Sequence, residues 1–258
     1  YAFGEQLTNQ DVDVSSGSTL SNDAGLTVRE LTGGPYTIDN RGTIEASNIT
    51  SNNSTIRIEV GTTADNSGLI DTDGSANLNS IHFIDNSESN SLTNSGTIQT
   101  ETTGNYGQAI HVENTNLTEI TNSSGGVIKV TDSALNSGAI RVSGSSSVNS
   151  ITNNETISAV GTTHSRGIIS INSATIDRVT NTGTISASGA SNSNYGIVFW
   201  NNSGTTVTNS GTIQGTGGNY SYGIRLGDNG SISTIKNPGT IKGGKDGISN
   251  SGNVTNIV

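Results

Sequence analysis

The sequence predicts an all-β fold, a right-handed, three-sided parallel β-helix (β-solenoid) with about 28 residues per coil. Three observations predict this fold class: a motif that returns at a nearly constant interval, short apolar alternations that return with it, and a composition rich in Gly, Ser, Thr and Asn. Only 29% of the 258 residues are hydrophobic. A stable core therefore requires these few residues to be stacked into continuous columns.

The repeated motif is Thr-Asn-Ser-Gly-Thr-Ile, which is clearest at 93–98, 180–185 and 208–213. Looser copies end at Ile44, Ile70, Ile128, Ile157 and Ile241, so successive final isoleucines stand 26 to 30 residues apart. A helical solenoid is disfavoured because Gly, Thr and Asn are poor helix formers. A propeller blade is disfavoured because it needs four strands in about 40 residues.

Two further apolar patterns keep the same period. Triplets of apolar, other and apolar residues begin at Ile56, Ile81, Ile110, Ile140, Ile169, Ile197 and Ile224. Shorter apolar segments occur at 117–120, 148–151, 176–179 and 232–235. Apolar residues at alternate positions are the signature of a strand with one buried face. Each repeat therefore predicts three short strands, which make one coil.

Eight asparagines hold an equivalent position at a turn, where stacked amides are expected to form a hydrogen-bonded ladder. They are Asn40, Asn66, Asn94, Asn122, Asn153, Asn181, Asn209 and Asn237. Seven precede their isoleucine by four residues, whereas Asn122 precedes Ile128 by six, which predicts a bulge at 124–126.

Glycines two residues after these asparagines predict a tight corner with positive φ. They are Gly42, Gly68, Gly96, Gly183, Gly211 and Gly239. Glu155 takes this place in one coil, where a corner residue with negative φ remains possible.

The repeat divides the chain into two parts. Residues 1–35 repeat poorly and are predicted to form an N-terminal cap and a first irregular coil. Residues 36–258 are predicted to be β-helix coils. No second cap is evident before Val258, so we expect the β-helix to be truncated at its C-terminal end.

The charge pattern limits the possible partners. The net charge of −10 argues against binding to nucleic acid or to anionic membrane surfaces. No apolar run is long enough to insert into a membrane, and the absence of Cys excludes a thiolate metal site. No cofactor is predicted.

The tandem Thr-Asn-Ser-Gly-Thr-Ile coils, followed by Tyr-Gly-Ile or Gly-Ala-Ile, resemble the passenger domains of bacterial autotransporters (type V secretion) over residues 36–258. This resemblance implies export across a bacterial outer membrane and a location at the cell surface or outside the cell. Many such passengers are adhesins or self-associating factors, and some carry proteases or esterases. The motifs are structural, so they indicate architecture more strongly than activity.

No catalytic residues are predicted. A protease would need a globular insertion with a nucleophile beside a base, and no coil departs from the period by more than a few residues. The Gly-x-Ser-x-Gly motif is absent, and the histidines are limited to His82, His111 and His164.

The strongest candidate for ligand binding is a column of outward-facing basic residues, predicted from the second position of the triplets: Arg57, His82, His111, Arg141 and Arg225. Such a stripe suits sulfated glycans or carboxylates. An ordinary solvated sheet face is the favoured interpretation of this column, and ligand binding is the alternative. His82 and His111 could hold zinc, but no third ligand is visible, so no metal site is predicted.

Aromatic residues cluster at Tyr195, Phe199 and Trp200, with Tyr220 and Tyr222 one coil later. Phe199 is expected to point inward, and Trp200 to face outward or to sit at a corner. Tyr195 and Trp200 are therefore candidates for stacking on a sugar or for a protein contact. The alternative is packing over the coil edge.

The segment Asp71-Thr72-Asp73-Gly74 resembles part of a calcium loop but lacks the EF-hand spacing and its Glu. An Asp-rich turn is the favoured interpretation, and calcium binding stays open.

The function predicted is that of a non-enzymatic bacterial surface adhesin. It would bind a host cell-surface glycan or a matrix protein, or would self-associate between cells through many weak contacts along its length. One alternative is a glycan-cleaving β-helix enzyme, which would need paired carboxylates on one sheet. In this sequence no carboxylate pair is expected to share a column. A second alternative is a passive spacer that presents a distal domain.

Overall fold

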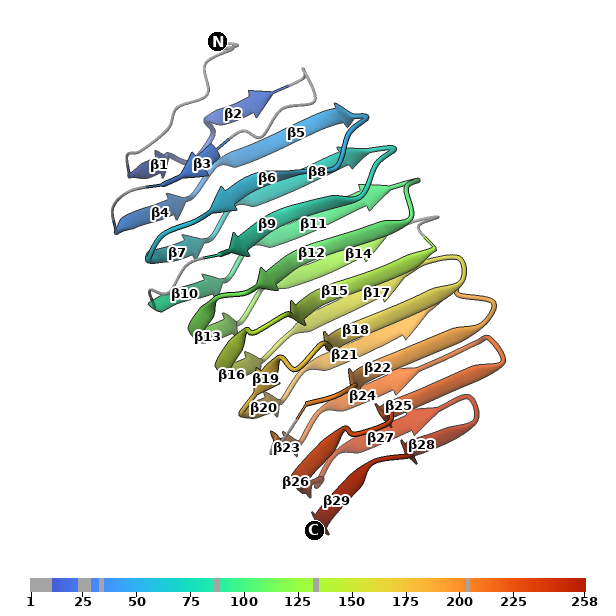
Figure 1. The fold of residues 1–258 in the computed structure, drawn as a ribbon. Helices are drawn as coiled ribbons and strands as arrows, with labels where there is room; N and C mark the ends of the chain where they lie inside the picture. Colours follow the sequence, from blue (N-terminus) through green and yellow to red (C-terminus); the bar gives the residue numbers. More distant parts are fainter. Residues whose placement is uncertain (1–10, 23–28, 33–34, 86–88, 132–134, 203–204) are drawn as a thin grey trace.

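The chain folds as a parallel β-solenoid of about eight turns, with three parallel sheets and about 28 residues per coil. The computed structural model describes residues 11–22, 29–32, 35–85, 89–131, 135–202 and 205–258. These residues contain strands and turns but no helix. Successive coils descend in order from the N-terminal end to the C-terminal end, and each contributes strands to all three sheets (Figure 1).

Sheet A contains the strands that lead into the Asn turn: β1 (Val12–Val14), β4 (Tyr36–Asn40), β7 (Thr62–Asn66), β10 (Ser89–Asn94), β13 (Asn116–Asn122), β16 (Ser147–Asn153), β19 (Thr175–Ile176), β20 (Arg178–Asn181), β23 (Thr205–Asn209), β26 (Ser231–Lys236) and β29 (Asn253–Ile257).

Sheet B contains the strands that follow this turn: β2 (Thr19–Asn22), β5 (Thr43–Ile49), β8 (Leu69–Gly74), β11 (Thr97–Thr102), β14 (Val127–Thr131), β17 (Thr156–Val160), β21 (Thr184–Ser188), β24 (Thr212–Gly215) and β27 (Thr240–Gly243).

Sheet C completes each coil: β3 (Arg29–Leu31), β6 (Asn53–Ile58), β9 (Leu78–Ile84), β12 (Tyr106–Glu113), β15 (Asn136–Ser143), β18 (His164–Ser170), β22 (Ser193–Phe199), β25 (Tyr220–Leu226) and β28 (Asp246–Asn250).

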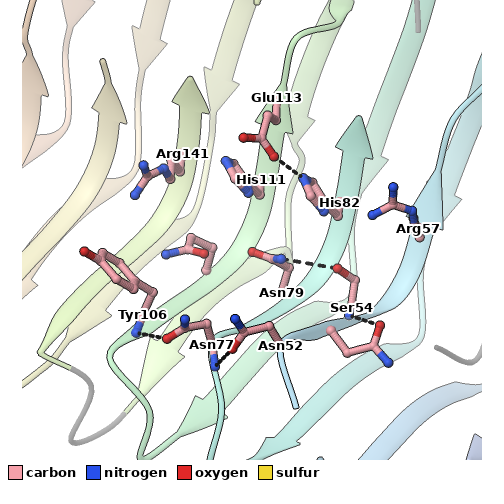
Figure 2. Close-up of a pocket in the computed structure, with 12 residues that line it drawn as sticks. Asn52, Ser54, Arg57, Asn77, Asn79, His82, Tyr106, His111, Glu113 and Arg141 are labelled. Carbon is pink, nitrogen blue, oxygen red and sulfur yellow. Dashed lines mark hydrogen bonds and ion pairs between the residues drawn. The ribbon is translucent and has the colours of Figure 1, made fainter. Parts of the chain in front are cut away.

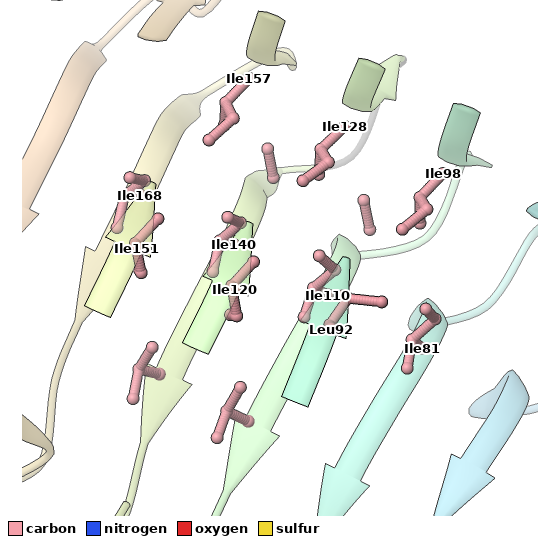
Figure 3. Packing of buried hydrophobic residues seen from close by; sticks show 14 of the residues in the cluster. Ile81, Leu92, Ile98, Ile110, Ile120, Ile128, Ile140, Ile151, Ile157 and Ile168 are labelled. Atoms are coloured by element: carbon pink, nitrogen blue, oxygen red, sulfur yellow. The ribbon is translucent and has the colours of Figure 1, made fainter. Parts of the chain in front are cut away.

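The coils stack so that each residue of the repeat lies beside its equivalent in the next coil. The final isoleucine of the motif forms one column inside sheet B, where Ile98 pairs with Ile70 and Ile128. Ile81, Ile110, Ile140 and Ile168 form a second column inside sheet C, and Leu92, Ile120 and Ile151 a third inside sheet A (Figure 3). These side chains are fully buried. A small apolar fraction therefore suffices because nearly all of it is removed from water.

The first described coil already follows this pattern. Strands β1, β2 and β3 pair in parallel with β4, β5 and β6. Most of the remaining segment of the predicted cap, including residues 1–10, lies outside the described residues, so the cap stays a prediction.

One predicted triplet is wrong by one residue. The sequence pattern places Ile169 and Ile171 inward, but Ile169 pairs with Arg141 on the outer face, and Ile168 and Ser170 point inward instead. Ile168 and Ile169 are both apolar, so alternation alone gave two possible registers.

The corner glycines have a different role from the predicted one. None of the six predicted corner glycines has a positive φ. A Cβ at Gly211 would collide with the carbonyl oxygen of Gly183 in the preceding coil, and a Cβ at Gly96 with that of Gly68. Glycine is therefore required here by close approach of stacked backbones.

Positive φ occurs instead at the corner after sheet C, where Asn114, Asn172, Asn201 and Asn229 adopt it. Asparagine tolerates this region better than most residues. Glu155 has a negative φ, which the sequence left open. Before it, the expected bulge at 124–126 contains Gly125, with a φ of 85°.

The eight asparagines form a ladder along the inside of the Asn turn. The Nδ2 atom of each residue from Asn40 to Asn209 donates to the Oδ1 atom of the next asparagine, over 2.6 to 2.8 Å. The same Nδ2 atoms donate to backbone carbonyls, for example from Asn153 to Glu155 and Thr184. All the amides except that of Asn237 belong to buried residues, so the ladder satisfies polar groups that water cannot reach.

We expect Asn153→Ala to lower the free energy of unfolding by about 1–3 kcal/mol. The substitution removes the acceptor of the Asn122 Nδ2 atom and the donor to the Asn181 Oδ1 atom, both inside the core. Urea denaturation followed by circular dichroism measures this loss. Asn149→Ala is the matched control, since Asn149 is exposed on the same strand, and its effect should stay within about 0.5 kcal/mol. Equal effects of the two changes would contradict a stabilising ladder.

Candidate functional site

The outer face of sheet C carries most of the basic and aromatic residues that the sequence singled out. Arg57, His82, His111 and Arg141 are consecutive partners on β6, β9, β12 and β15. The column then continues through Ile169 and Val198 before it reaches Arg225. The predicted basic stripe is therefore interrupted, and Arg225 belongs to a different neighbourhood.

The two imidazoles lie face to face near the middle of this sheet. Their ring centroids are 4.5 Å apart and the rings are nearly parallel, with an interplanar angle of 3°. His82 Nε2 donates to Glu113 Oε2 over 3.2 Å (Figure 2). His111 Nε2 shares a 2.8 Å hydrogen bond with Ser143 Oγ. His82 and Ser143 are buried, whereas His111 and Glu113 are partly exposed.

Glu113 is the residue that sequence reasoning missed. It stands two positions after His111 on β12 and so projects from the same face of the strand. The expectation that His82 and His111 lack a third ligand is wrong, since their potential ligand atoms and that of Glu113 all lie within 4.8 Å of one another. The sequence signal that indicates Glu113 is its place two residues after His111, which puts both side chains on one face of the strand.

The environment shifts the protonation of this group. The hydrogen bond from His82 is the largest cause that lowers the pKa of Glu113, to about 2. Burial, followed by electrostatic repulsion from His82 and Arg141, lowers the pKa of His111 to about 3, and Glu113 opposes that shift. At neutral pH the site therefore holds a carboxylate beside a neutral imidazole.

A depression of about 390 Å³ opens over these residues. Arg57 and Arg141 stand on its two sides, with Asn79 and Tyr106 along the floor and edge (Figure 2). Arg57 is neutralised by Glu59, whose Oε1 atom is 2.6 Å from the Arg57 Nη2 atom.

Arg141 and Arg166 have no carboxylate within ion-pairing distance in the described part of the chain. Their Nε atoms are buried without a hydrogen-bond partner among the described residues. Burial lowers the pKa of Arg141, and it is also the largest cause that lowers the pKa of Arg166, to about 10. Arginine stays charged at neutral pH, so each group is a cation that has lost part of its hydration without forming an ion pair among the described residues. Glu113 is close enough to Arg141 to raise its pKa and so offsets part of that cost.

Aromatic rings cover these cations. The guanidinium carbon of Arg141 lies 6.0 Å from the ring centroid of Tyr106, and that of Arg166 lies 5.4 Å from the ring of Trp200. A second depression, of about 280 Å³, lies between these residues and adjoins the first through Tyr106 and Arg141. Cation and ring pairs therefore continue across neighbouring coils of one face.

The predicted aromatic site is only partly accessible. Tyr195 is 8% exposed and packs against Val198 and Tyr222 in a small apolar cluster on the outside of the sheet. Trp200 is half-buried against Gly227, where a Cβ would collide with the indole. Trp200 thus packs over the coil edge and keeps part of one surface exposed, whereas Tyr195 supports it from below.

The acidic residues are arranged differently from the expectation. Asp39 pairs with Asp13 and Asp65 in one column of sheet A. Glu45 pairs with Asp71 on sheet B. The expectation that no carboxylate pair shares a column is therefore wrong, because positions that appear scattered along the chain align once the coils stack.

The segment from Asp71 to Asp73 is part of strand β8 and not a turn. Asp71 accepts a 2.9 Å hydrogen bond from Gln99 Nε2, and burial is the largest cause that raises its pKa. In the part of the chain that the structure describes, the groups His82, His111 and Glu113 form the one cluster with metal-ligand geometry, so Asp71 and Asp73 do not belong to such a cluster.

Comparisons with protein-family models, with curated proteins and with solved structures find no match to this chain. The class that the fold defines is that of a parallel β-solenoid with three sheets. No helix in the described residues is long and apolar enough to cross a membrane.

The lowered pKa of His111 predicts a stability that falls on acidification. His111 takes up a proton near pH 6.5 in the unfolded chain and only near pH 3 in the folded chain. The neutral His111 therefore contributes fully to the free energy of unfolding above pH 6.5, and this contribution is lost as the pH falls from 6.5 to about 3. The unfolding free energy of wild type minus that of His111→Asn should shrink by at most about 1.4 kcal/mol per pH unit in this window. Urea denaturation at several pH values measures the difference. An NMR titration in which the His111 ring titrates near its ordinary pKa would contradict the prediction.

Proposed function

We propose that this protein is a non-enzymatic binding rod, a bacterial surface adhesin that holds an anionic glycan on the outer face of sheet C. The single observation that supports this proposal most is the pair of partly desolvated guanidinium groups of Arg141 and Arg166, which lie beside aromatic rings and form no ion pair among the described residues. A sulfate or carboxylate would supply the missing counter-charge.

The chemistry of the face fits a sugar polymer better than a nucleic acid. Guanidinium groups bind carboxylates and sulfates through two parallel hydrogen bonds, and exposed ring edges or faces contact the apolar side of a sugar. The protein as a whole carries a net charge of −10, which would repel a nucleic acid. A glycan chain could lie across successive coils and contact Arg141, Arg166 and Trp200 in turn.

In this proposal, the affinity for the glycan comes from similar contacts repeated on successive coils. Parallel strands are about 4.8 Å apart, so an extended ligand meets a new coil at nearly every step along the rod. Contacts of this kind are individually weak and add through multivalent display on a surface. Export across a bacterial outer membrane and display at the cell surface, which the autotransporter resemblance implies, are part of the same proposal.

Binding to a sulfated polysaccharide such as heparin tests the proposal. Arg141→Gln combined with Arg166→Gln should weaken binding at least tenfold, since a charge-assisted hydrogen bond contributes about 1.5–3 kcal/mol. The matched control is Arg178→Gln, an exposed arginine on sheet A, which should bind as the wild type does. Thermal melts establish that both variants fold.

Retained binding by the double variant would overturn the glycan proposal. If the protein binds neither sulfated nor carboxylated glycans but forms concentration-dependent dimers in analytical ultracentrifugation, self-association between cells is favoured. Binding to matrix proteins alone would favour a protein receptor, and silence in all assays would favour a passive spacer.

A second candidate, a glycan-cleaving enzyme, is favoured by one observation on sheet B. Asp71 lies in register with Glu45, its pKa is raised, and Glu101 is one of the charges that raise it. Glycoside hydrolysis uses two carboxyl groups, one of which has a raised pKa and acts as the general acid.

Reducing-end release from a panel of acidic polysaccharides tests this candidate. Under the adhesin proposal we expect no turnover. Release that is abolished by Asp71→Asn and retained by Asp39→Asn, a change in the acidic column of sheet A, would establish the enzyme instead.

A further inference from the structure

We propose that His82, His111 and Glu113 form a binding site for one divalent transition-metal ion of the zinc class on the outer face of sheet C. The three potential ligand atoms lie within 4.8 Å of one another. Imidazole nitrogen and carboxylate oxygen are ligands that Zn²⁺ accepts, at about 2.0–2.2 Å. The inference does not rest on the proposed glycan binding, although Arg141 lines the same depression.

The fold brings the ligands together from two neighbouring strands. His82 on β9 and His111 on β12 are register partners, so their Cα atoms are about one strand spacing apart. Glu113 lies two residues further along β12, on the same face, and its carboxylate already contacts His82. An ion placed between the two strands would therefore replace a hydrogen bond that exists and would not need a change of backbone.

The imidazoles must move a little to bind the same ion. Two nitrogens bound at about 2.1 Å approach each other to roughly 3.5 Å. The parallel rings, with centroids 4.5 Å apart, therefore have to tilt toward each other. Both rings border an open depression rather than packed side chains on that side, which gives them the space to do so.

The surrounding charges act in both directions on a cation at this point. Arg141 repels positive charge at His111 and so opposes the ion. Glu113 supplies a negative ligand, and the charge of Arg57 is paired with Glu59. Three protein ligands leave at least one coordination position for water or an anion. Ser143 Oγ, already hydrogen-bonded to His111, is placed to orient that imidazole from outside the coordination sphere.

Isothermal titration of the tag-free protein with Zn²⁺ tests the site, after treatment with a chelator and its removal. We expect saturable binding of one ion per chain. Glu113→Gln should weaken binding at least tenfold, and His82→Asn combined with His111→Asn should abolish it. The control is His164→Asn, whose residue lies on β18 outside the cluster and which should bind as the wild type does.

NMR provides a readout that identifies the ligands directly. Added Zn²⁺ should shift the imidazole signals of His82 and His111 and leave that of His164 unchanged. Glu113 is half-exposed at the strand end, so Glu113→Gln should fold even where the double histidine variant does not. The proposal is overturned when Zn²⁺ does not saturate a single site, when folded Glu113→Gln binds as tightly as wild type, or when the shifts fall on His164.

Discussion

The in-register stacking of parallel coils is the constraint on which the rest of this structure depends. Each residue of one coil lies beside its equivalent in the next, so a side chain must be compatible with a copy of itself about 4.8 Å away. Isoleucine meets this requirement by packing, as in the column through Ile98. Asparagine meets it by hydrogen bonding, because one amide is both donor and acceptor. Glycine at 96 and 211 meets it by having no side chain at all.

The same constraint explains how much of the fold the sequence could predict. The period, the three sheets and the positions of the isoleucine and asparagine columns follow from spacing, since stacking forces equivalent residues to recur. The register at Ile169 did not follow, because two adjacent isoleucines fit either face. The corner glycines were also ambiguous. Positive φ and close approach both select glycine, and only the path of the neighbouring coil separates the two causes.

The candidate site was harder to predict for a related reason. The basic column from Arg57 to Arg141 could be read from the triplets, because these residues hold one repeat position. Glu113 holds a different position of the repeat, two residues after His111, and its contact with His82 one coil away becomes evident only when the coils are stacked. The burial of Tyr195 depends on Tyr222, its register partner in the next coil, and on Val198 of its own strand. Contacts such as the one between Glu113 and His82 join different positions of the repeat, so they carry no periodic signal in the sequence.

The asparagine ladder also gives the rod a dipole along its axis. In every step the Nδ2 atom of one coil donates to the Oδ1 atom of the coil that follows it in sequence, from Asn40 through to Asn237. The amide dipoles therefore point the same way and add along the axis, and each bond polarises the next. The N-terminal end of such a ladder presents amide oxygens, which accept hydrogen bonds, and the C-terminal end presents amide nitrogens, which donate them. A coil that extends the ladder must therefore present its own amide in the same orientation.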